Sequence, residues 1–177
     1  SALLRDAPAT AAEAAVIIRE AAASDRVLRL VGAGTWLSAG HPVRADAELS
    51  TEKLVGITSY RPEDLTLSAG AGTTLAELDA ATRAHGQWCP LFPWGDDRGT
   101  IGATIATATS GPFAERLGRP RELVLGLECV DGTGRIVAAG GRVVKNVAGF
   151  DLTKLEVGGF GAFGIITECA MRLRAVP

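Results

Sequence analysis

The chain has 177 residues, of which 47% are hydrophobic and 21% charged, and its formal net charge at pH 7 is −2. These values are typical of a globular protein, and the length suits one domain or two small lobes that share a core. The weak negative charge and an aromatic content of 5% argue against nucleic acid as a partner. No apolar run is long enough to span a membrane, so we expect no direct membrane insertion.

Capping boxes and short apolar runs predict alternating helices and strands in the first half of the chain. Thr10 and Glu13 precede apolar residues at helical spacing, which predicts a helix over about residues 11–23. Thr74 and Glu77 form a second capping box, and Gly86 provides a stop for the helix that follows. Strands are predicted over residues 27–31, within residues 47–54 and over residues 65–70.

The sequence Gly-Ala-Gly-Thr-Trp at residues 32–36 follows the first of these strands directly. It is not a Rossmann fingerprint, because Leu37 stands where the third glycine belongs and residues 38–42 read as a loop rather than a helix. The Gly-Lys-Ser/Thr of a phosphate-binding NTPase loop is also absent from the sequence. A turn of this kind can hold a phosphate through backbone N–H groups, and an ordinary tight turn explains it equally well.

A second unusual stretch, residues 98–112, consists almost entirely of small residues apart from Ile101 and Ile105. Thr100 is placed to cap the N-terminus of a helix that runs to about Thr109, and such a helix lets a flat ligand or another backbone approach closely. A tightly packed core helix would have the same composition. The loop before it, residues 87–95, is rich in proline and tryptophan, which suits a hydrophobic anchor or a neighbouring planar ligand.

The second half of the chain has the pattern of an antiparallel sheet. Alternating apolar residues predict strands, and a turn at residues 131–134 predicts a hairpin. The predicted elements are strands over 123–130, 135–139 and 165–173 and a short helix over 151–155. Cys89, Cys129 and Cys169 are widely spaced and odd in number, which predicts reduced thiols in a cytoplasmic protein.

Taken together, five segments resemble the flavin-binding domain of the vanillyl-alcohol oxidase (PCMH-type) superfamily, in the order that the family has. They are residues 32–36, 100–103, 110–111, 140–151 and 161–168. The sequence Lys-Asn-Val-Ala-Gly-Phe-Asp at residues 145–151 is especially similar to the FAD-binding subunits of bacterial glycolate oxidases.

The resemblance implies an α+β fold of two lobes: a small N-terminal α/β lobe, and a mostly antiparallel sheet with flanking helices. It implies one FAD-binding domain over residues 1–177, with the first lobe at about 1–95 and the second at about 96–177. The family normally continues into a substrate-binding cap domain, and we expect none within this sequence.

The resemblance also implies where FAD lies, extended between the lobes with its pyrophosphate on the glycine turn. Backbone N–H groups of residues 32–36, and those near Thr100 and Ile101, are then expected around the phosphates. The adenine is expected beside residues 164–166, and the flavin nearer residues 110–111. The predicted cofactor-binding residues are Gly32, Ala33, Gly34, Thr35, Trp36, Leu37, Pro93, Thr100, Ile101, Gly102, Ala103, Ala106, Thr107, Ser110, Gly111, Gly164, Ile165 and Ile166.

Members of the family that attach flavin covalently often carry histidine in the glycine turn, where this chain has Thr35 and Trp36. We therefore expect noncovalent FAD. We identify no metal site and no catalytic residue. The expected activity is oxidation of a small 2-hydroxy acid such as glycolate with hydride transfer to the flavin, supported by catalytic and iron–sulfur partner subunits.

The alternative hypothesis is a degenerate flavin fold that stabilises a catalytic partner without binding a cofactor. Gly32, Gly34 and Gly102 favour binding, because a scaffold has no need for exposed backbone at these positions. A nucleotide-sugar reductase of the same fold lacks support, because no constellation of a catalytic acid and a serine is evident.

Overall fold

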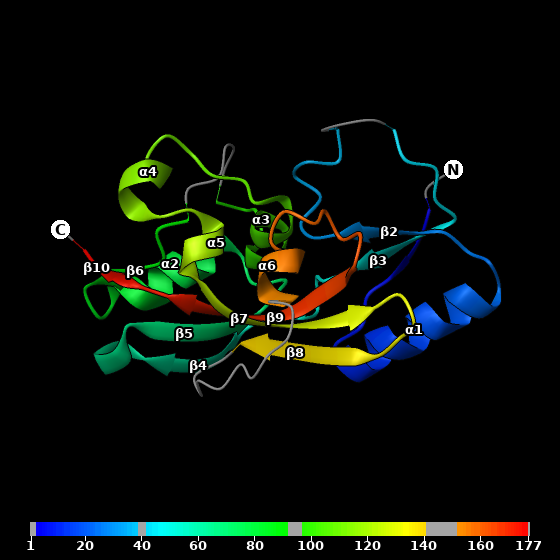
Figure 1. Cartoon of the computed structure of the whole chain (residues 1–177), viewed down its shortest axis with the longest axis horizontal. Helices are drawn as coiled ribbons and strands as arrows, with labels where there is room; N and C mark the ends of the chain where they lie inside the picture. The colour runs from blue at the N-terminus through cyan, green and yellow to red at the C-terminus, as the bar shows by residue number, and fades with distance from the viewer. Residues whose placement is uncertain (1–2, 39–41, 92–96, 141–151, 177) are drawn as a thin grey trace.

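The computed structural model describes residues 3–38, 42–91, 97–140 and 152–176 (Figure 1). The helices are α1 (Ala11–Ala23), α2 (Leu75–Arg83), α3 (Ile101–Thr107), α4 (Ala114–Leu117), α5 (Pro120–Leu123) and α6 (Leu152–Glu156), with the 3-10 turn η1 (Pro62–Asp64). The strands are β1 (Leu4–Asp6), β2 (Leu28–Val31), β3 (Ala47–Ser50), β4 (Ile57–Arg61), β5 (Thr66–Gly70), β6 (Gln87–Trp88), β7 (Val124–Asp131), β8 (Ile136–Gly140), β9 (Gly164–Arg172) and β10 (Arg174–Ala175). Among these described helices, none is long and apolar enough to cross a membrane.

Two sheets organise the described chain, and they confirm the predicted α+β fold. The smaller sheet is parallel with strand order β1-β3-β2, and the larger is antiparallel with order β4-β5-β9-β7-β8. A two-stranded pair joins β6 to β10. Strands β4 and β5 precede residue 95 yet belong to the larger sheet, so the change of sheet falls between β3 and β4 rather than near residue 95.

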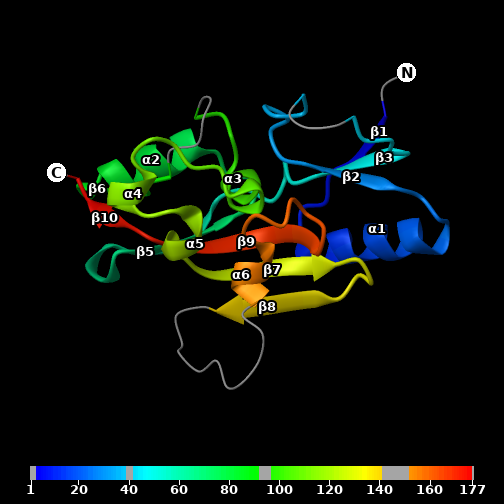
Figure 2. The same cartoon turned by 45° about the horizontal axis from the view of Figure 1, so that its top comes forward.

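Helix α1 packs between the two sheets (Figure 2). Ala14 and Ile18 on its buried face cluster with Leu49 of β3, Val130 of β7 and Ile165 of β9. The helix begins where predicted, because the Thr10 hydroxyl accepts a hydrogen bond from the backbone N–H of Glu13 at 3.1 Å. Burial of one apolar face against both sheets fixes their relative position.

The central strand of the smaller sheet carries a buried carboxylate that binds arginines on both neighbouring strands. Glu48 of β3 accepts hydrogen bonds from Arg5 of β1, at 2.7 Å, and from Arg29 of β2, and its side chain is only 7% exposed. The hydrogen bond from Arg29 and the one from Arg5 lower the pKa of Glu48 against the opposing effect of burial. Arg5, Glu48 and Arg29 are direct neighbours across the three parallel strands, so this ion-pair network links all three.

The predicted hairpin turn at residues 131–134 is confirmed between β7 and β8. Gly134 N–H donates to the Asp131 carbonyl at 2.9 Å, and the Asp131 carboxylate accepts from the Thr133 hydroxyl at 2.6 Å. The hydrogen bond from the Thr133 hydroxyl, followed by the one that the backbone N–H of Arg135 donates to the same carboxylate at 3.1 Å, lowers the pKa of Asp131 to about 2. Arg19 of α1 reaches the Gly134 carbonyl at 2.8 Å, so the hairpin is held against the N-terminal helix.

Candidate functional site

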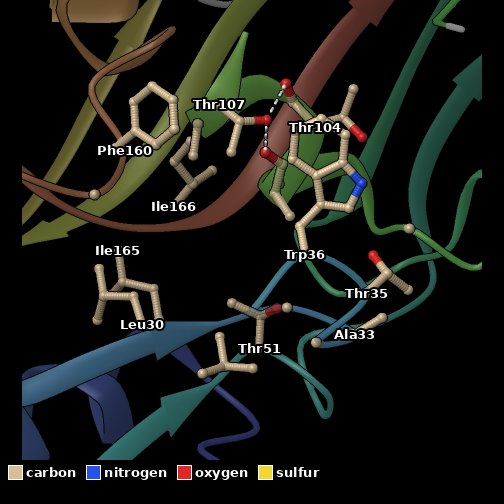
Figure 3. A pocket seen from close by; sticks show the side chains of 18 of the residues that line it. Leu30, Ala33, Thr35, Trp36, Thr51, Thr104, Thr107, Phe160, Ile165 and Ile166 are labelled. Atoms are coloured by element: carbon tan, nitrogen blue, oxygen red, sulfur yellow. Dashed lines mark hydrogen bonds between the residues drawn. The ribbon is translucent and has the colours of Figure 1, made fainter. Parts of the chain in front are cut away.

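A cavity of about 230 Å³ lies where the smaller sheet, α3 and the start of β9 meet (Figure 3). The end of β2 and the glycine turn form one wall, α3 forms another, and the loop before β9 forms a third. The lining residues are Leu30, Val31, Gly32, Ala33, Gly34, Thr35, Trp36, Leu37, Thr51, Gly99, Gly102, Ala103, Thr104, Ala106, Thr107, Thr109, Phe160, Gly161, Gly164, Ile165 and Ile166. Helix, sheet edge and turn thus converge on one space.

The glycine turn presents unpaired backbone donors at this cavity. Within the part of the chain that the structure describes, no acceptor is found for the N–H groups of residues 32–36. Gly34 adopts a left-handed conformation, with φ +73°, which turns the chain back on itself. Successive free N–H groups in such a turn form a concave site for an anion.

Helix α3 supplies a smooth wall because its polar side chains bond to their own helix. Thr104 and Thr107 donate to the carbonyls of Thr100 and Ala103, at 2.9 and 2.8 Å, and Thr107 also lies 2.6 Å from the Thr109 hydroxyl (Figure 3). Ala108, with φ +50°, ends the helix, so it stops at Thr107 rather than at the predicted Thr109. The small residues on this face of α3 allow the glycine turn to approach the helix closely.

The N-terminus of α3 does not supply free donors, and the prediction that it does is wrong. Thr100 caps the helix as expected, since its hydroxyl accepts from Ala103 N–H at 3.3 Å. However, Ile101 N–H donates to the Thr73 carbonyl and Gly102 N–H to the Ala71 carbonyl, each at 2.9 Å. These N–H groups hold α3 against the end of β5 and are unavailable to a phosphate.

The first residues of β9 present a free strand edge to the same cavity. Gly164, Ile165 and Ile166 pair with β7 on one side, while β5 pairs with β9 only from Glu168 onwards. No strand among the described residues covers the other edge of residues 164–166. Their free backbone groups are suited to hydrogen bonds with the edge of a planar heterocycle.

The structure brings together most of the residues predicted from the sequence. Those that line the cavity are Gly32, Ala33, Gly34, Thr35, Trp36, Leu37, Gly102, Ala103, Ala106, Thr107, Gly164, Ile165 and Ile166. Thr100 and Ile101 are buried behind it, at 3% and 0% exposure. Ser110 and Gly111 line a second, very small cavity that shares Thr109 with the first. Pro93 and the predicted motif at residues 141–151 lie outside the described residues.

Several lining residues were not predicted. Leu30 and Val31 end a predicted strand, and Gly99 and Thr104 lie in the small-residue stretch, so proximity in sequence to the predicted residues could have identified them. Phe160 directly precedes the family segment at residues 161–168, whereas Thr51 has no such signal, because tertiary packing alone brings it to the cavity.

None of the described lining residues carries a charged side chain. An anion bound here would be held by backbone N–H groups and hydroxyls rather than by lysine or arginine. The thiols do not offer a nucleophile, because Cys129 and Cys169 are buried, and burial raises the pKa of Cys129 to about 12 and that of Cys169 further still. The described lining residues therefore offer groups that can hold a ligand, and they include no evident acid or base.

Two of the three glycines that favour cofactor binding over a scaffold role are also required for packing around α3. A Cβ on Gly32 would lie 2.6 Å from the Thr100 hydroxyl, and one on Gly102 would lie 2.6 Å from the Ala71 Cβ. Both glycines are therefore required for close packing around α3, whether or not a ligand binds. Of the three glycines, only Gly34 lacks such a packing requirement, since its nearest neighbours are 3.5 Å or more away.

Several curated proteins are similar to this chain over most of its length. The glycolate oxidase subunit GlcE of Escherichia coli K12 is 33% identical over 162 residues, which cover 90% of this chain and 46% of that protein. The D-lactate dehydrogenase of Archaeoglobus fulgidus is 36% identical over 167 residues, covering 94% of this chain and 37% of that protein. The chain thus spans less than half of the length of these two relatives.

Solved structures of alkyldihydroxyacetonephosphate synthase share the fold, with a TM-score of 0.81 and 22% identity over 98% of this chain and 32% of that one. At this identity the likeness concerns the fold alone. The family model described as an FAD binding domain matches residues 3–140, which is most of the chain. The chain therefore belongs to the FAD binding domain (PCMH-type) family, as the resemblance of its motifs implied.

Proposed function

We propose that this chain binds one FAD noncovalently in the cavity between its two sheets, with the diphosphate on the glycine turn. The observation that carries the proposal is the row of unpaired N–H groups at residues 32–36, which line a cavity without charged side chains. Membership of the FAD binding domain family supports the identity of the ligand. Each N–H directed at a phosphate oxygen forms a charge-assisted hydrogen bond.

The remaining walls have the properties that the rest of the cofactor requires. The uncovered edge at residues 164–166 offers backbone donors and acceptors to the adenine, and the small face of α3 leaves room for the ribityl chain. Ser110 and Gly111, in the second cavity beyond Thr109, are assigned to the flavin end. Noncovalent binding is supported by Thr35 and Trp36, which occupy the part of the turn where covalent members often carry histidine.

We further propose that the whole protein oxidises a small 2-hydroxy acid, such as glycolate or D-lactate, to the 2-oxo acid. The similarity to a glycolate oxidase subunit and to a D-lactate dehydrogenase supports this class of substrate. Bound FAD supplies the acceptor for the hydride that leaves the hydroxyl-bearing carbon. This chain binds and orients the cofactor. Residues outside the described cavity, and catalytic and iron–sulfur partner subunits, bind the substrate and accept the electrons from the reduced flavin.

The visible absorption spectrum of the purified chain, before and after acid precipitation, tests the cofactor proposal. We expect flavin bands in the native protein that move entirely into the supernatant after precipitation, because no covalent link retains them. Bands that remain in the pellet would contradict noncovalent binding. A colourless protein that fails to take up added FAD would contradict FAD binding and support the scaffold alternative.

A further inference from the structure

Phe160 is an anomaly among the lining residues. Its side chain is 75% exposed, the largest exposure among the big apolar side chains that the structure describes. Its backbone has φ +52°, in the left-handed region that a bulky residue adopts only at a cost. A large aromatic side chain held out at the edge of a cavity, on a strained backbone, is typical of a ligand contact rather than of packing.

The loop that carries Phe160 is firmly held. Phe160 N–H donates to the Ala106 carbonyl at 2.8 Å, and Gly158 N–H donates to the Ile105 carbonyl at 3.1 Å, so two carbonyls of α3 fix the loop. On the other side, Gly161 lies so close to β2 that a Cβ there would be 2.7 Å from Leu30 Cδ1. The loop that carries the Phe160 ring is therefore held by α3 on one side and by β2 on the other.

The Phe160 ring lies at one end of the cavity, which indicates the part of the cofactor that it contacts. Figure 3 shows Phe160 beside Ile166, on the side of the cavity opposite Trp36. Ile166 belongs to the free edge of β9, to which we assign the adenine. Ser110 and Gly111, assigned to the flavin, line the other cavity, which does not include Phe160.

We propose that Phe160 packs its ring against the adenine of bound FAD and covers that end of the site. This inference rests on the FAD-binding function proposed above. Stacking of an aromatic side chain on a base removes apolar surface of both rings from water and depends little on the exact orientation of the base. Phe160 is thereby a binding residue for the adenosine half of the cofactor, and this contact accounts for both the exposure of its side chain and its left-handed backbone.

Titrations of the apoprotein with FAD, ADP and FMN test this assignment. We expect Phe160→Ala to weaken binding of both FAD and ADP by about 5- to 20-fold and to change FMN binding by less than about 2-fold. Phe163→Ala is the matched control, because Phe163 is 46% exposed on the same loop but does not line the cavity. It should leave all three affinities unchanged.

Phe160→Gly separates binding from folding. Glycine relieves the left-handed strain, so the apoprotein of this variant should melt at or above the wild-type temperature while losing FAD and ADP affinity like Phe160→Ala. Unchanged FAD and ADP affinity in a wild-type background that binds FAD would overturn the role of Phe160 alone. An equal loss for ADP and FMN would overturn the assignment to adenine. A wild-type chain that binds no FAD would instead refute the function on which the inference rests.

Discussion

Replacing Ala33 by aspartate is expected to weaken FAD binding by at least about 30-fold, since a fixed negative charge within a few ångströms of a diphosphate costs about 2–3 kcal/mol after solvent screening. Ala33 lies in the glycine turn, lines the cavity and is exposed, so we expect it to accept a larger side chain. Isothermal titration of apoprotein with FAD measures the loss. Added salt should recover part of it, because the repulsion is screened.

Ala33→Asn is the matched control for this effect. Asparagine has the shape of aspartate without the charge, and we expect it to lower FAD affinity by no more than about 5-fold, the steric share of the effect. Both variants should melt within about 2 °C of wild type, because the position is exposed. Equal losses for the two variants, or a wild-type affinity for Ala33→Asp, would show that the diphosphate does not lie on the turn.

Replacing Gly72 by alanine is expected to lower the free energy of unfolding by about 3 kcal/mol, because overpacking against backbone cannot be relieved by side-chain rotation. A Cβ on Gly72 would lie 1.9 Å from the Thr51 carbonyl oxygen. Gly72 N–H donates to the Leu54 carbonyl at 2.8 Å, and Thr51 N–H donates to Val31 at 2.9 Å. The substitution therefore pushes apart the segments that join the two sheets, next to the cavity.

Urea denaturation of the two alanine variants Gly72→Ala and Gly132→Ala measures this cost. Gly132 lies in the β7–β8 turn, no atom lies within 4 Å of a Cβ placed there, and its φ is outside the left-handed region. Its variant should stay within about 0.5 kcal/mol of wild type. A similar loss for both variants would mean that a general intolerance of alanine at glycine positions, rather than the close approach to Thr51, determines stability.

The elements that the sequence predicted well are those with local signals. Helix α1 occupies residues 11–23 as predicted, because the Thr10 cap and the apolar spacing specify its start and its buried face. Strands β5, β7 and β9 agree with prediction to within one or two residues. Strands β1, β6 and β10, of two or three residues, were not predicted, since so short a run carries no periodicity and depends on its pairing partner.

Strand β4 and the assignment of strands to sheets were missed for a related reason. No strand is predicted between residues 54 and 65, because β4 is partly exposed and has a bulge between Ile57 and Ser59, which breaks the alternation of apolar and polar residues. Its membership of the larger sheet comes from pairing with β5, a tertiary contact that no local pattern announces.

In the candidate site, too, features with a local sequence signal are predicted, while those that depend on tertiary contacts are not. The turn at residues 32–36 and the small-residue helix are visible in the sequence as clusters of glycine, alanine and threonine. The use of the Ile101 and Gly102 N–H groups by Thr73 and Ala71 depends on how α3 docks on the end of β5. The exposure of Phe160 likewise appears only once its loop is fixed to α3 and β2.

The most direct test of the central claim is a nuclear magnetic resonance titration of the isotopically labelled chain with FAD, following the backbone amides. We expect the largest shifts among backbone amides of the glycine turn and α3 at residues 32–36, whose N–H groups lack an acceptor in the described chain. Ile101 and Gly102 should move little, because their N–H groups already bond to carbonyls. If saturating FAD left the amides of residues 32–36 unshifted, the diphosphate would not lie on the glycine turn.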